Sequence, residues 1–243
     1  MKLKFIVPII TDEDLGPMEE RVGNYVSEST EVHVESIPYG SVSNESFLDE
    51  AVNTPSVIKM AGKAERDGYD GVFIECMLDL GLEAVREVVD IPVVGPGRTS
   101  ILCAVDLADN FSIITELEHT NVSFLHLVRS LGLESKLASI RSIEMPVLEL
   151  NNRSRLLQSA MEAAETAVIE DGAHSLILGC TRMVGVETEM RNRLKQKGYH
   201  VPLIYGVPLT LRYLENLINS ELTQSKRTYR TPPEKKNTLF DRI

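Results

Sequence analysis

Two short segments of the chain have nearly the same pattern, and each ends in a cysteine. Residues 67–76 run from an Asp-Gly pair through an apolar stretch to Cys76, and residues 171–180 run from an Asp-Gly pair to Cys180. Each segment predicts a turn followed by a short strand, with the thiol where the strand stops. A thiolate can remove a proton from a carbon beside a carbonyl group, and a thiol can return one to the opposite face. Two such thiols around one substrate could therefore invert a stereocentre without a cofactor.

The overall composition limits the function classes open to the chain. Its 243 residues are 43% hydrophobic, which is enough for one large domain or for two α/β lobes with real cores. The formal net charge of −11 argues against a general binder of nucleic acids or anionic membranes. An anionic small molecule stays compatible, because backbone N–H groups and helix dipoles can hold a carboxylate.

Targeting and metal-binding signals are weak. The apolar run at residues 5–10 is too short for a signal peptide and contains Pro8, and no run reaches the ~20 apolar residues of a membrane span. The three cysteines have neither CxxC nor His-rich spacing, so neither a metal site nor a disulfide framework is predicted. We expect a cytoplasmic protein with reduced thiols.

Short apolar runs alternate with helical patterns along the chain. The predicted strands cover residues 4–10, 32–37, 72–75 and 92–94, then 111–114, 137–143, 176–178 and 202–205. The longer predicted helices cover residues 15–28, 45–67, 82–89, 153–170, 187–197 and 209–222. Pro55 is expected to break the second of these helices into two pieces. Thr99 or Ser100 is expected to cap a helix that carries residues 101–105.

This alternation predicts an α/β fold with two pseudo-symmetric lobes, each a parallel sheet flanked by helices. We expect residues 1–108 with 209–222 in the first lobe, residues 109–208 in the second, and a polar C-terminal tail at residues 223–243. The tail is expected to be flexible or to clasp another subunit. Sites in parallel sheets form beyond the carboxyl ends of the strands, so the expected active site is the cleft between the lobes.

The residues around both cysteines resemble a known family. Residues 68–82, 92–95 and 171–180 are similar to the aspartate/glutamate/hydantoin racemase superfamily, and most of all to its hydantoin racemase branch. A Cys-x-x-Asp-x-Gly-Leu pattern begins at Cys76, and a Leu-Gly-Cys pattern ends at Cys180. The resemblance implies two lobes around a cleft, chemistry without pyridoxal phosphate, and these two thiols as the catalytic acid and base.

The surroundings of the thiols lead to two further expectations. A cysteine just before a helix N-terminus gains from the helix dipole, so we expect a lowered pKa at Cys76 and Cys180. Glu75 would raise the pKa of Cys76 if its carboxylate were close, but the alternation of side chains along a strand favours an orientation away from it. Cys103 lies inside a helical run without a counterpart in the repeat, and we expect it in the core.

Departures from the family pattern leave the substrate open. Residues 7–11 keep only the proline and one hydroxyl of the Asn-Pro-Asn-Thr type loop that hydantoin racemases usually carry. Met77 and Leu78 stand where the amino-acid racemases tend to have Asn-Thr, whereas Thr181 matches that amino-acid branch. The resemblance therefore points to the reaction type more firmly than to one substrate.

Other side chains near strand ends are candidates for holding the substrate. The substrate-binding residues that we expect are Thr11, Met77, Thr99, Thr115 and Thr181. The threonine hydroxyls could bind a carboxylate or a ring carbonyl, with helix capping as the alternative role.

Charged and histidine side chains are weaker candidates. Arg98 and Arg182 could neutralise an anionic substrate, with a plain surface position as the alternative. His119 follows a strand end and is expected in a solvated loop, and His174 begins a strand at the end away from the cleft. Residues 95–98 lack the glycine-rich phosphate-binding patterns, so nucleotide binding is not expected.

The sequence thus predicts an isomerase that racemises a small α-chiral carboxylate or a hydantoin-like cyclic ureide without a cofactor. The alternatives within enzymes are an aspartate/glutamate-type amino-acid racemase and a maleate isomerase-like cis-trans isomerase with a nucleophilic cysteine. An arylmalonate decarboxylase type of reaction uses a single cysteine and is disfavoured by the presence of both. A small-ligand-binding sensor is the non-enzymatic alternative. We expect a small-molecule substrate, no nucleic-acid or membrane partner, and a homo-oligomer.

Overall fold

The computed structural model describes residues 1–233 and divides the chain into two compact units. The first unit comprises Met1–Pro96 and the chain from Thr210 onward, and the second comprises Gly97–Leu209. The helix at residues 96–107, which the sequence analysis assigns to the first lobe, thus groups with the second unit. Within the described part of the chain, no helix is both long enough and apolar enough to cross a membrane.

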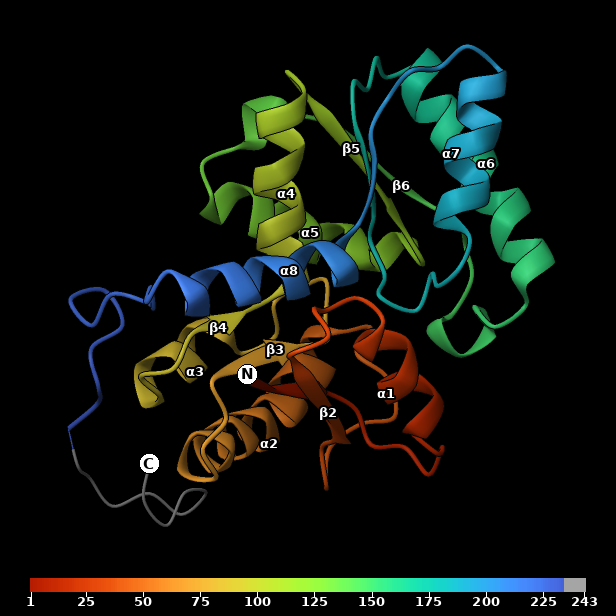
Figure 1. Cartoon of the computed structure of the whole chain (residues 1–243). Helices are drawn as coiled ribbons and strands as arrows, with labels where there is room; N and C mark the ends of the chain where they lie inside the picture. The colour runs from red at the N-terminus through yellow and green to blue at the C-terminus, as the bar shows by residue number, and fades with distance from the viewer. Residues whose placement is uncertain (234–243) are drawn as a thin grey trace. The chain divides into compact units, whose positions relative to one another are not determined.

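The first unit is built on a parallel sheet with the strand order β2-β1-β3-β4 (Figure 1). Its strands are β1 (Lys2–Val7), β2 (Glu31–Ser36), β3 (Gly71–Ile74) and β4 (Val93–Val94). Its helices are α1 (Gly16–Gly23), α2 (Phe47–Arg66) and α3 (Leu82–Val88), together with most of α8 (Gly206–Asn219). The parallel order requires a crossover between successive strands, and these helices supply it.

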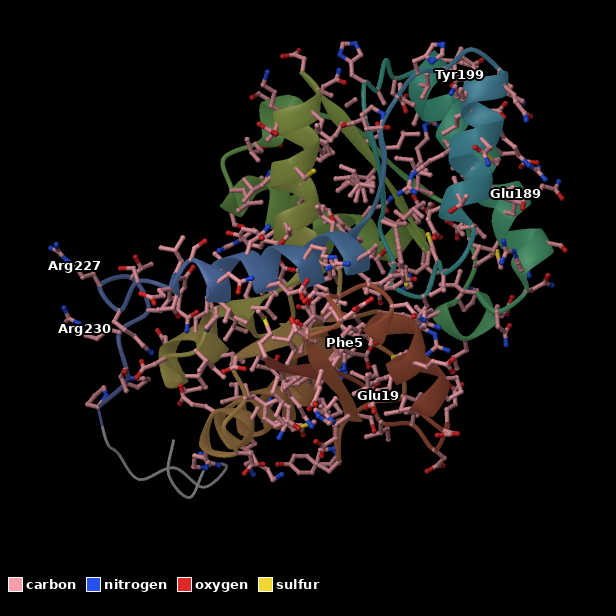
Figure 2. All side chains as sticks on the ribbon, in the orientation of Figure 1. Phe5, Glu19, Glu189, Tyr199, Arg227 and Arg230 are labelled. Carbon is pink, nitrogen blue, oxygen red and sulfur yellow. The ribbon has the colours of Figure 1, made fainter. Side chains whose placement is uncertain are left out.

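The central strands of this sheet are buried on both faces, as a sheet covered by helices requires. On one face Phe5 stacks on Phe73 with ring centroids 4.5 Å apart, and Figure 2 shows Phe5 in the interior of the unit. Gly71 lies on this face too, where a Cβ would come within 2.9 Å of Leu214 on α8. The glycine therefore allows α8 to approach the sheet closely.

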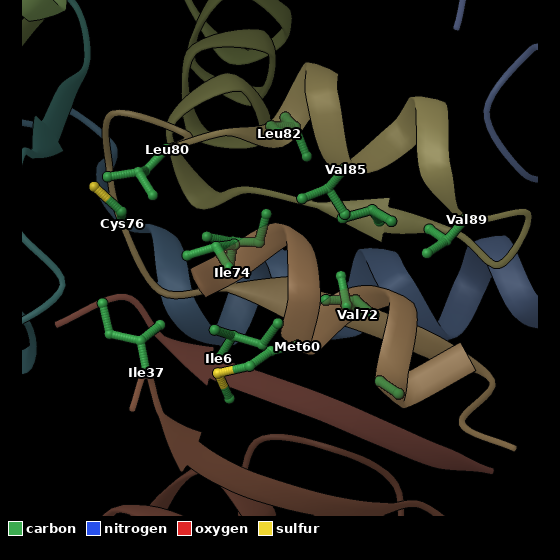
Figure 3. Packing of buried hydrophobic residues seen from close by; sticks show 14 residues of the cluster. Ile6, Ile37, Met60, Val72, Ile74, Cys76, Leu80, Leu82, Val85 and Val89 are labelled. Carbon is green, nitrogen blue, oxygen red and sulfur yellow. The ribbon is translucent and has the colours of Figure 1, made fainter. Parts of the chain in front are cut away.

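The opposite face carries an apolar cluster that ends at a thiol. Side chains of β1, β3 and β4 pack there against α2 and α3. Figure 3 shows Cys76 and Leu80 at one end of this cluster and Val89 at the other. The core of the first unit thus extends to the carboxyl end of β3.

The second unit repeats the arrangement with the strand order β6-β5-β7-β8, again all parallel. Its strands are β5 (Phe111–Thr115), β6 (Leu137–Ser142), β7 (Leu176–Leu178) and β8 (Leu203–Tyr205). Its helices are α4 (Pro96–Leu107), α5 (Asn121–Ser130), α6 (Arg153–Ile169) and α7 (Glu187–Gln196), with short 3₁₀ turns at Glu118–Thr120, Glu134–Lys136 and Val147–Glu149. The predicted α/β fold with two similar parallel sheets is confirmed.

Two local predictions about helices are wrong. Helix α2 continues through Pro55, because the buried side chains of Asn53 and Val57 anchor it on both sides of the proline. The hydroxyl of Thr54 also donates to the carbonyl oxygen of Glu50 within this stretch. Helix α4 begins at Pro96, a residue suited to the first helical turn, so Thr99 and Ser100 lie inside the helix and do not cap it.

The described part of the C-terminal tail, residues 223–233, contacts the first unit. The side chain of Gln224 donates to the carbonyl oxygen of Ile91 at 2.8 Å and accepts from the backbone N–H of Val93 at 3.2 Å. Lys226 Nζ donates to carbonyl oxygens at the C-terminal end of α3, those of Arg86, Glu87 and Val89. This segment covers the outer edge of β4, the last strand of the sheet. The rest of the predicted tail, residues 234–243, lies outside the described residues.

Candidate active site

Cys76 lies in a tight turn directly beyond β3. The backbone N–H of Glu75 donates to the carbonyl oxygen of Ile6 at 2.9 Å, which makes the last contact between β3 and β1. The backbone N–H of Cys76 then donates to Ile74, and the carbonyl oxygen of Cys76 accepts from Asp79, each at 2.9 Å. The thiol is thus fixed at the carboxyl end of a central strand, where the sequence analysis expects it.

Burial dominates the chemistry of this thiol. Cys76 is only 8% exposed, and burial raises its pKa to about 12. Two donors act against this, the backbone N–H of Leu78 and the side-chain amide of Asn44, whose Nδ2 lies 3.2 Å from Sγ. The expected lowering by a helix dipole is wrong for Cys76, because α3 begins only at Leu82. Dipole effects fall off within the first turn of a helix.

Two carboxylates add to the raised pKa of Cys76. They belong to Glu50, on the first turn of α2, and Asp79, on the turn that follows the cysteine. Burial raises the pKa of Glu50 itself. Asp79 adopts a φ of 53°, in the left-handed region, and a Cβ at Gly95 would lie 2.2 Å from its Oδ1. Gly95 therefore leaves the space in which the Asp79 carboxylate sits.

Cys180 occupies the equivalent place in the second unit. The backbone N–H of Gly179 donates to the carbonyl oxygen of Ile114 at 2.7 Å, just as Glu75 bonds to Ile6 in the first unit. The carbonyl oxygen of Cys180 then accepts from the backbone N–H of Met183 at 3.1 Å, and the thiol is half-buried. Helix α7 begins only at Glu187, so Cys180 does not directly precede a helix either.

The expected substrate-binding residues of the first unit follow two adjacent strands. Thr11 lies beyond β1 and accepts a hydrogen bond at Oγ1 from the backbone N–H of Glu13, which gives it the role of a turn residue. Met77 directly follows Cys76 and is 4% exposed. Both residues lie on the carboxyl side of the sheet, as the sequence analysis expects.

The remaining three expected substrate-binding residues belong to the second unit. Thr115 ends β5 and donates its hydroxyl to Asn121 Oδ1 at 2.7 Å, and Thr181 follows Cys180 with its carbonyl oxygen bound by the Tyr205 hydroxyl at 2.7 Å. Since β5 and β7 are neighbours, Thr115, Cys180 and Thr181 lie at one edge of the sheet. Thr99 lies in the first turns of α4.

The weaker candidates are two arginines, two histidines and the third cysteine. Arg98 and Arg182 are both half-buried. His119 lies in the 3₁₀ turn after β5, and His174 precedes β7 with its backbone N–H bound to Asn110. Cys103 lies on α4 as predicted, but it is half-buried and not part of the fully buried core.

Asn44, which the sequence patterns do not single out, contacts the thiol of Cys76. Asn44 lies beyond the carboxyl end of β2, the strand next to β1. The rule that sites form beyond the carboxyl ends of parallel strands could have selected it. Among residues 1–233, no cluster of histidine, cysteine and acidic side chains is arranged to hold a metal ion.

Comparisons with known proteins identify the family of this arrangement. The family model described as Asp/Glu/Hydantoin racemase matches residues 17–214. A hydantoin racemase of Pseudomonas sp. (strain NS671) is 31% identical over 237 residues, which cover 97% of this chain and 93% of that protein. A hydantoin racemase of Paenarthrobacter aurescens is 35% identical over 194 residues, covering 79% of this chain and 80% of that protein.

A solved structure agrees with this result. The allantoin racemase of Pseudomonas fluorescens superimposes with a TM-score of 0.89 at 27% identity, covering 98% of this chain and 99% of the other. The fold is thus shared with a racemase over 98% of this chain. Together with the family match, this places the chain in the Asp/Glu/hydantoin racemase family.

Proposed function

We propose that this protein is a cofactor-independent racemase of cyclic ureides of the hydantoin or allantoin class, with Cys76 and Cys180 as its two acid/base residues. Membership of the racemase family makes the chain an isomerase. The two relatives named above are hydantoin racemases, and the solved structure with the same fold is an allantoin racemase. This supports a five-membered ureide ring over a free amino acid.

One observation carries the assignment of the catalytic residues. Glu75 and Gly179 make the same hydrogen bond to the neighbouring central strand, to Ile6 and Ile114 respectively. Each is followed at once by a cysteine, so the two thiols occupy the same place in two copies of one fold. A buried cysteine at a single strand end is ordinary packing, whereas a matched pair at repeated positions is what a two-base reaction needs.

In the proposed reaction, one thiol removes a proton from the substrate and the other thiol returns a proton to it. A thiolate removes the proton from the ring carbon beside the carbonyl, so the C–H bond breaks, an S–H bond forms and the electron pair passes into an enolate. The other thiol then donates its proton to the opposite face of that carbon. Backbone N–H groups in the turns beyond the strands would stabilise the enolate oxygen.

The raised pKa of Cys76 assigns the starting roles in this proposal. Burial keeps Cys76 protonated near neutral pH, so in this proposal Cys76 can start the reaction as the acid and Cys180 as the base. In the reverse direction the two thiols exchange roles, as racemisation in both senses requires.

Free thiols are a condition of this mechanism. The three cysteines form no disulfide with one another, and oxidation of either proposed catalytic thiol would remove an acid or a base. A reducing compartment such as the cytoplasm suits such an enzyme. The expected homo-oligomer stays a prediction, which size-exclusion chromatography with light scattering would test.

Exchange of the substrate's α-proton in D₂O, followed by NMR together with optical rotation, tests the proposal. The substrates are both enantiomers of 5-substituted hydantoins and of allantoin, beside aspartate, glutamate and maleate. Wild type is compared with Cys76→Ser and Cys180→Ser, and Cys103→Ser is the matched control because this third thiol lies on α4. We expect a ureide to exchange and lose optical activity in wild type and control, with both activities abolished in the two other variants.

The other outcomes separate the alternatives. Exchange of aspartate or glutamate alone would identify an amino-acid racemase, and conversion of maleate would identify a cis-trans isomerase. Activity that survives Cys76→Ser or Cys180→Ser would refute the two-base mechanism. A protein that binds a ureide without exchanging its proton would instead be a ligand sensor.

A further inference from the structure

The side-chain amide of Asn44 contacts the sulfur of Cys76. Its Nδ2 donates to Sγ at 3.2 Å, from a segment that follows β2 and precedes α2. The Oδ1 atom of the same carboxamide is buried and has no hydrogen-bond partner within residues 1–233. A buried polar atom left unpaired lowers stability, so stability alone does not account for an asparagine at this position.

The segment that carries Asn44 is fixed by α2 and not by the thiol. Asn53, which is fully buried, accepts from the backbone N–H of Ser41 at 2.6 Å and donates to the carbonyl oxygen of Ser43 at 3.4 Å. The Ser41 hydroxyl also donates to Asp49 Oδ1 at 2.7 Å. These contacts would hold the amide in place whether the sulfur is protonated or not.

Gly40, the residue before Ser41, shows how closely this segment packs against α2. Gly40 has a φ of 155°, and a Cβ there would lie 2.3 Å from Asn53 Oδ1. The absence of a side chain at position 40 lets the chain pass directly over the buried Asn53. The fit therefore depends on backbone and buried groups, which move less than surface side chains.

We propose that Asn44 is a positioning residue for the proposed racemase reaction: its amide stabilises the thiolate form of Cys76 and fixes the orientation of the sulfur. The inference rests on the proposed function, in which Cys76 alternates between thiol and thiolate. A donor to a charged acceptor is about twice as strong as one between neutral groups, so the Asn44 bond strengthens when the proton leaves. It therefore favours the form that the reverse reaction needs.

Several other groups also influence the protonation of the Cys76 sulfur. The carboxylates of Glu50 on α2 and of Asp79 in the turn after Cys76 raise the pKa of the thiol, and the backbone N–H of Leu78 is the second donor. Burial and both carboxylates oppose the thiolate, while the two N–H groups favour it. Of these two donors, only the side chain of Asn44 can be removed by substitution.

The rate at which Cys76 reacts with iodoacetamide tests the inference without any substrate. Peptide mass spectrometry separates Cys76 from the other thiols, and the rate is followed between about pH 7 and pH 10, where only the thiolate reacts. The variants are Asn44→Asp, which keeps the size of the side chain, and Asn44→Leu, which removes its polarity. Ser43→Ala is the matched control, because it alters the same segment through a hydroxyl that donates to Glu45 and not to the sulfur.

We expect both Asn44 variants to react at least roughly tenfold more slowly at a given pH, since loss of a charge-assisted donor raises the pKa of the thiol. Asn44→Asp should be the slower of the two, because it adds a negative charge. Ser43→Ala should react like wild type. Unchanged alkylation in both Asn44 variants, in folded protein, would overturn the inference even if wild type racemises ureides. Slowed alkylation in a protein without exchange activity would refute the proposed function and leave the Asn44 contact standing.

Discussion

Gly179 approaches the neighbouring strand more closely than any side chain would allow. Its N–H donates to the carbonyl oxygen of Ile114 at 2.7 Å, and a Cβ at this glycine would lie 2.8 Å from the same oxygen. The obstacle is backbone, which cannot turn aside as a flexible side chain can. Because Cys180 is the next residue, the missing side chain decides where the proposed catalytic thiol lies.

Replacement of Gly179 by alanine should therefore move Cys180 as well as weaken the second unit. We expect Gly179→Ala to lose about 1–3 kcal/mol of unfolding free energy, the usual range for overpacking a buried site, and to lower exchange activity at least tenfold. Gly23→Ala is the matched control, because nothing lies within 4 Å of its Cβ position. Urea unfolding and the D₂O exchange assay measure both effects. Full activity in Gly179→Ala would show that the close approach does not position the thiol.

The repeat explains why the sequence predicts the fold so well. Apolar strands bounded by Asp-Gly turns are local signals, and they occur twice in the same order around Cys76 and Cys180. Parallel strands with helical crossovers admit few arrangements, so correct strands lead to the correct sheets and strand ends. The same signals predict the cysteines at those strand ends.

The parts that sequence did not reveal depend on contacts between distant residues. Asn44 and Cys76 are 32 positions apart, and no local pattern indicates that their side chains meet. The raised pKa of Cys76 comes from burial, which depends on the packed unit and not on neighbours in the chain. Pro55 locally favours a break in α2, yet tertiary packing on both sides of it outweighs this preference.

Glu215 should make the stability of the first unit depend on pH. This buried residue of α8 accepts from the hydroxyls of Ser27 and Thr30, each at 2.6 Å. Burial tends to raise the pKa of Glu215, but the hydrogen bonds outweigh it and the net shift is downward. A lowered pKa contributes stability above the unfolded value of about 4.3, and this contribution is lost as the pH falls through the folded value.

We therefore expect Glu215→Gln to lose about 1–3 kcal/mol of unfolding free energy at neutral pH, the range for hydrogen bonds to a charged group. The difference from wild type should shrink as the pH falls through the lowered pKa of folded Glu215, where the glutamate also loses its charge. Urea unfolding at several pH values measures this. The exposed Glu20→Gln on α1 serves as the control, and an equal loss at all pH values would show that the charge is not the cause.

The C-terminal segment should stabilise α3 through Lys226. Its Nζ donates to three carbonyl oxygens at the end of α3, where a positive charge also favours the helix dipole. We expect Lys226→Met to lower the unfolding free energy by about 1 kcal/mol or more. Arg227→Ala is the control, since Arg227 is exposed and extends away from the ribbon (Figure 2). Equal melting curves for Lys226→Met and wild type would contradict the capping role.

Removal of the carboxylates near Cys76 should have the opposite effect from removal of Asn44. Glu50 and Asp79 both raise the pKa of Cys76, so their loss should lower it and increase the thiolate fraction at a given pH. We expect Asp79→Asn and Glu50→Gln each to speed alkylation of Cys76 a few-fold, since partly screened charges shift a pKa by a fraction of a unit. Asparagine also tolerates the left-handed backbone at position 79.

Asp67→Asn is the control for these variants, because this exposed carboxylate is paired with Lys63 at the far end of α2. Its alkylation rate should match wild type. If Asp79→Asn and Glu50→Gln react no faster than the control, burial alone sets the pKa of Cys76 and the two carboxylates have another role. If both react faster while the Asn44 variants react more slowly, the protonation of Cys76 is balanced between opposing neighbours. In that case, the pH profile of proton exchange should move to lower pH in the two carboxylate variants and to higher pH in the Asn44 variants.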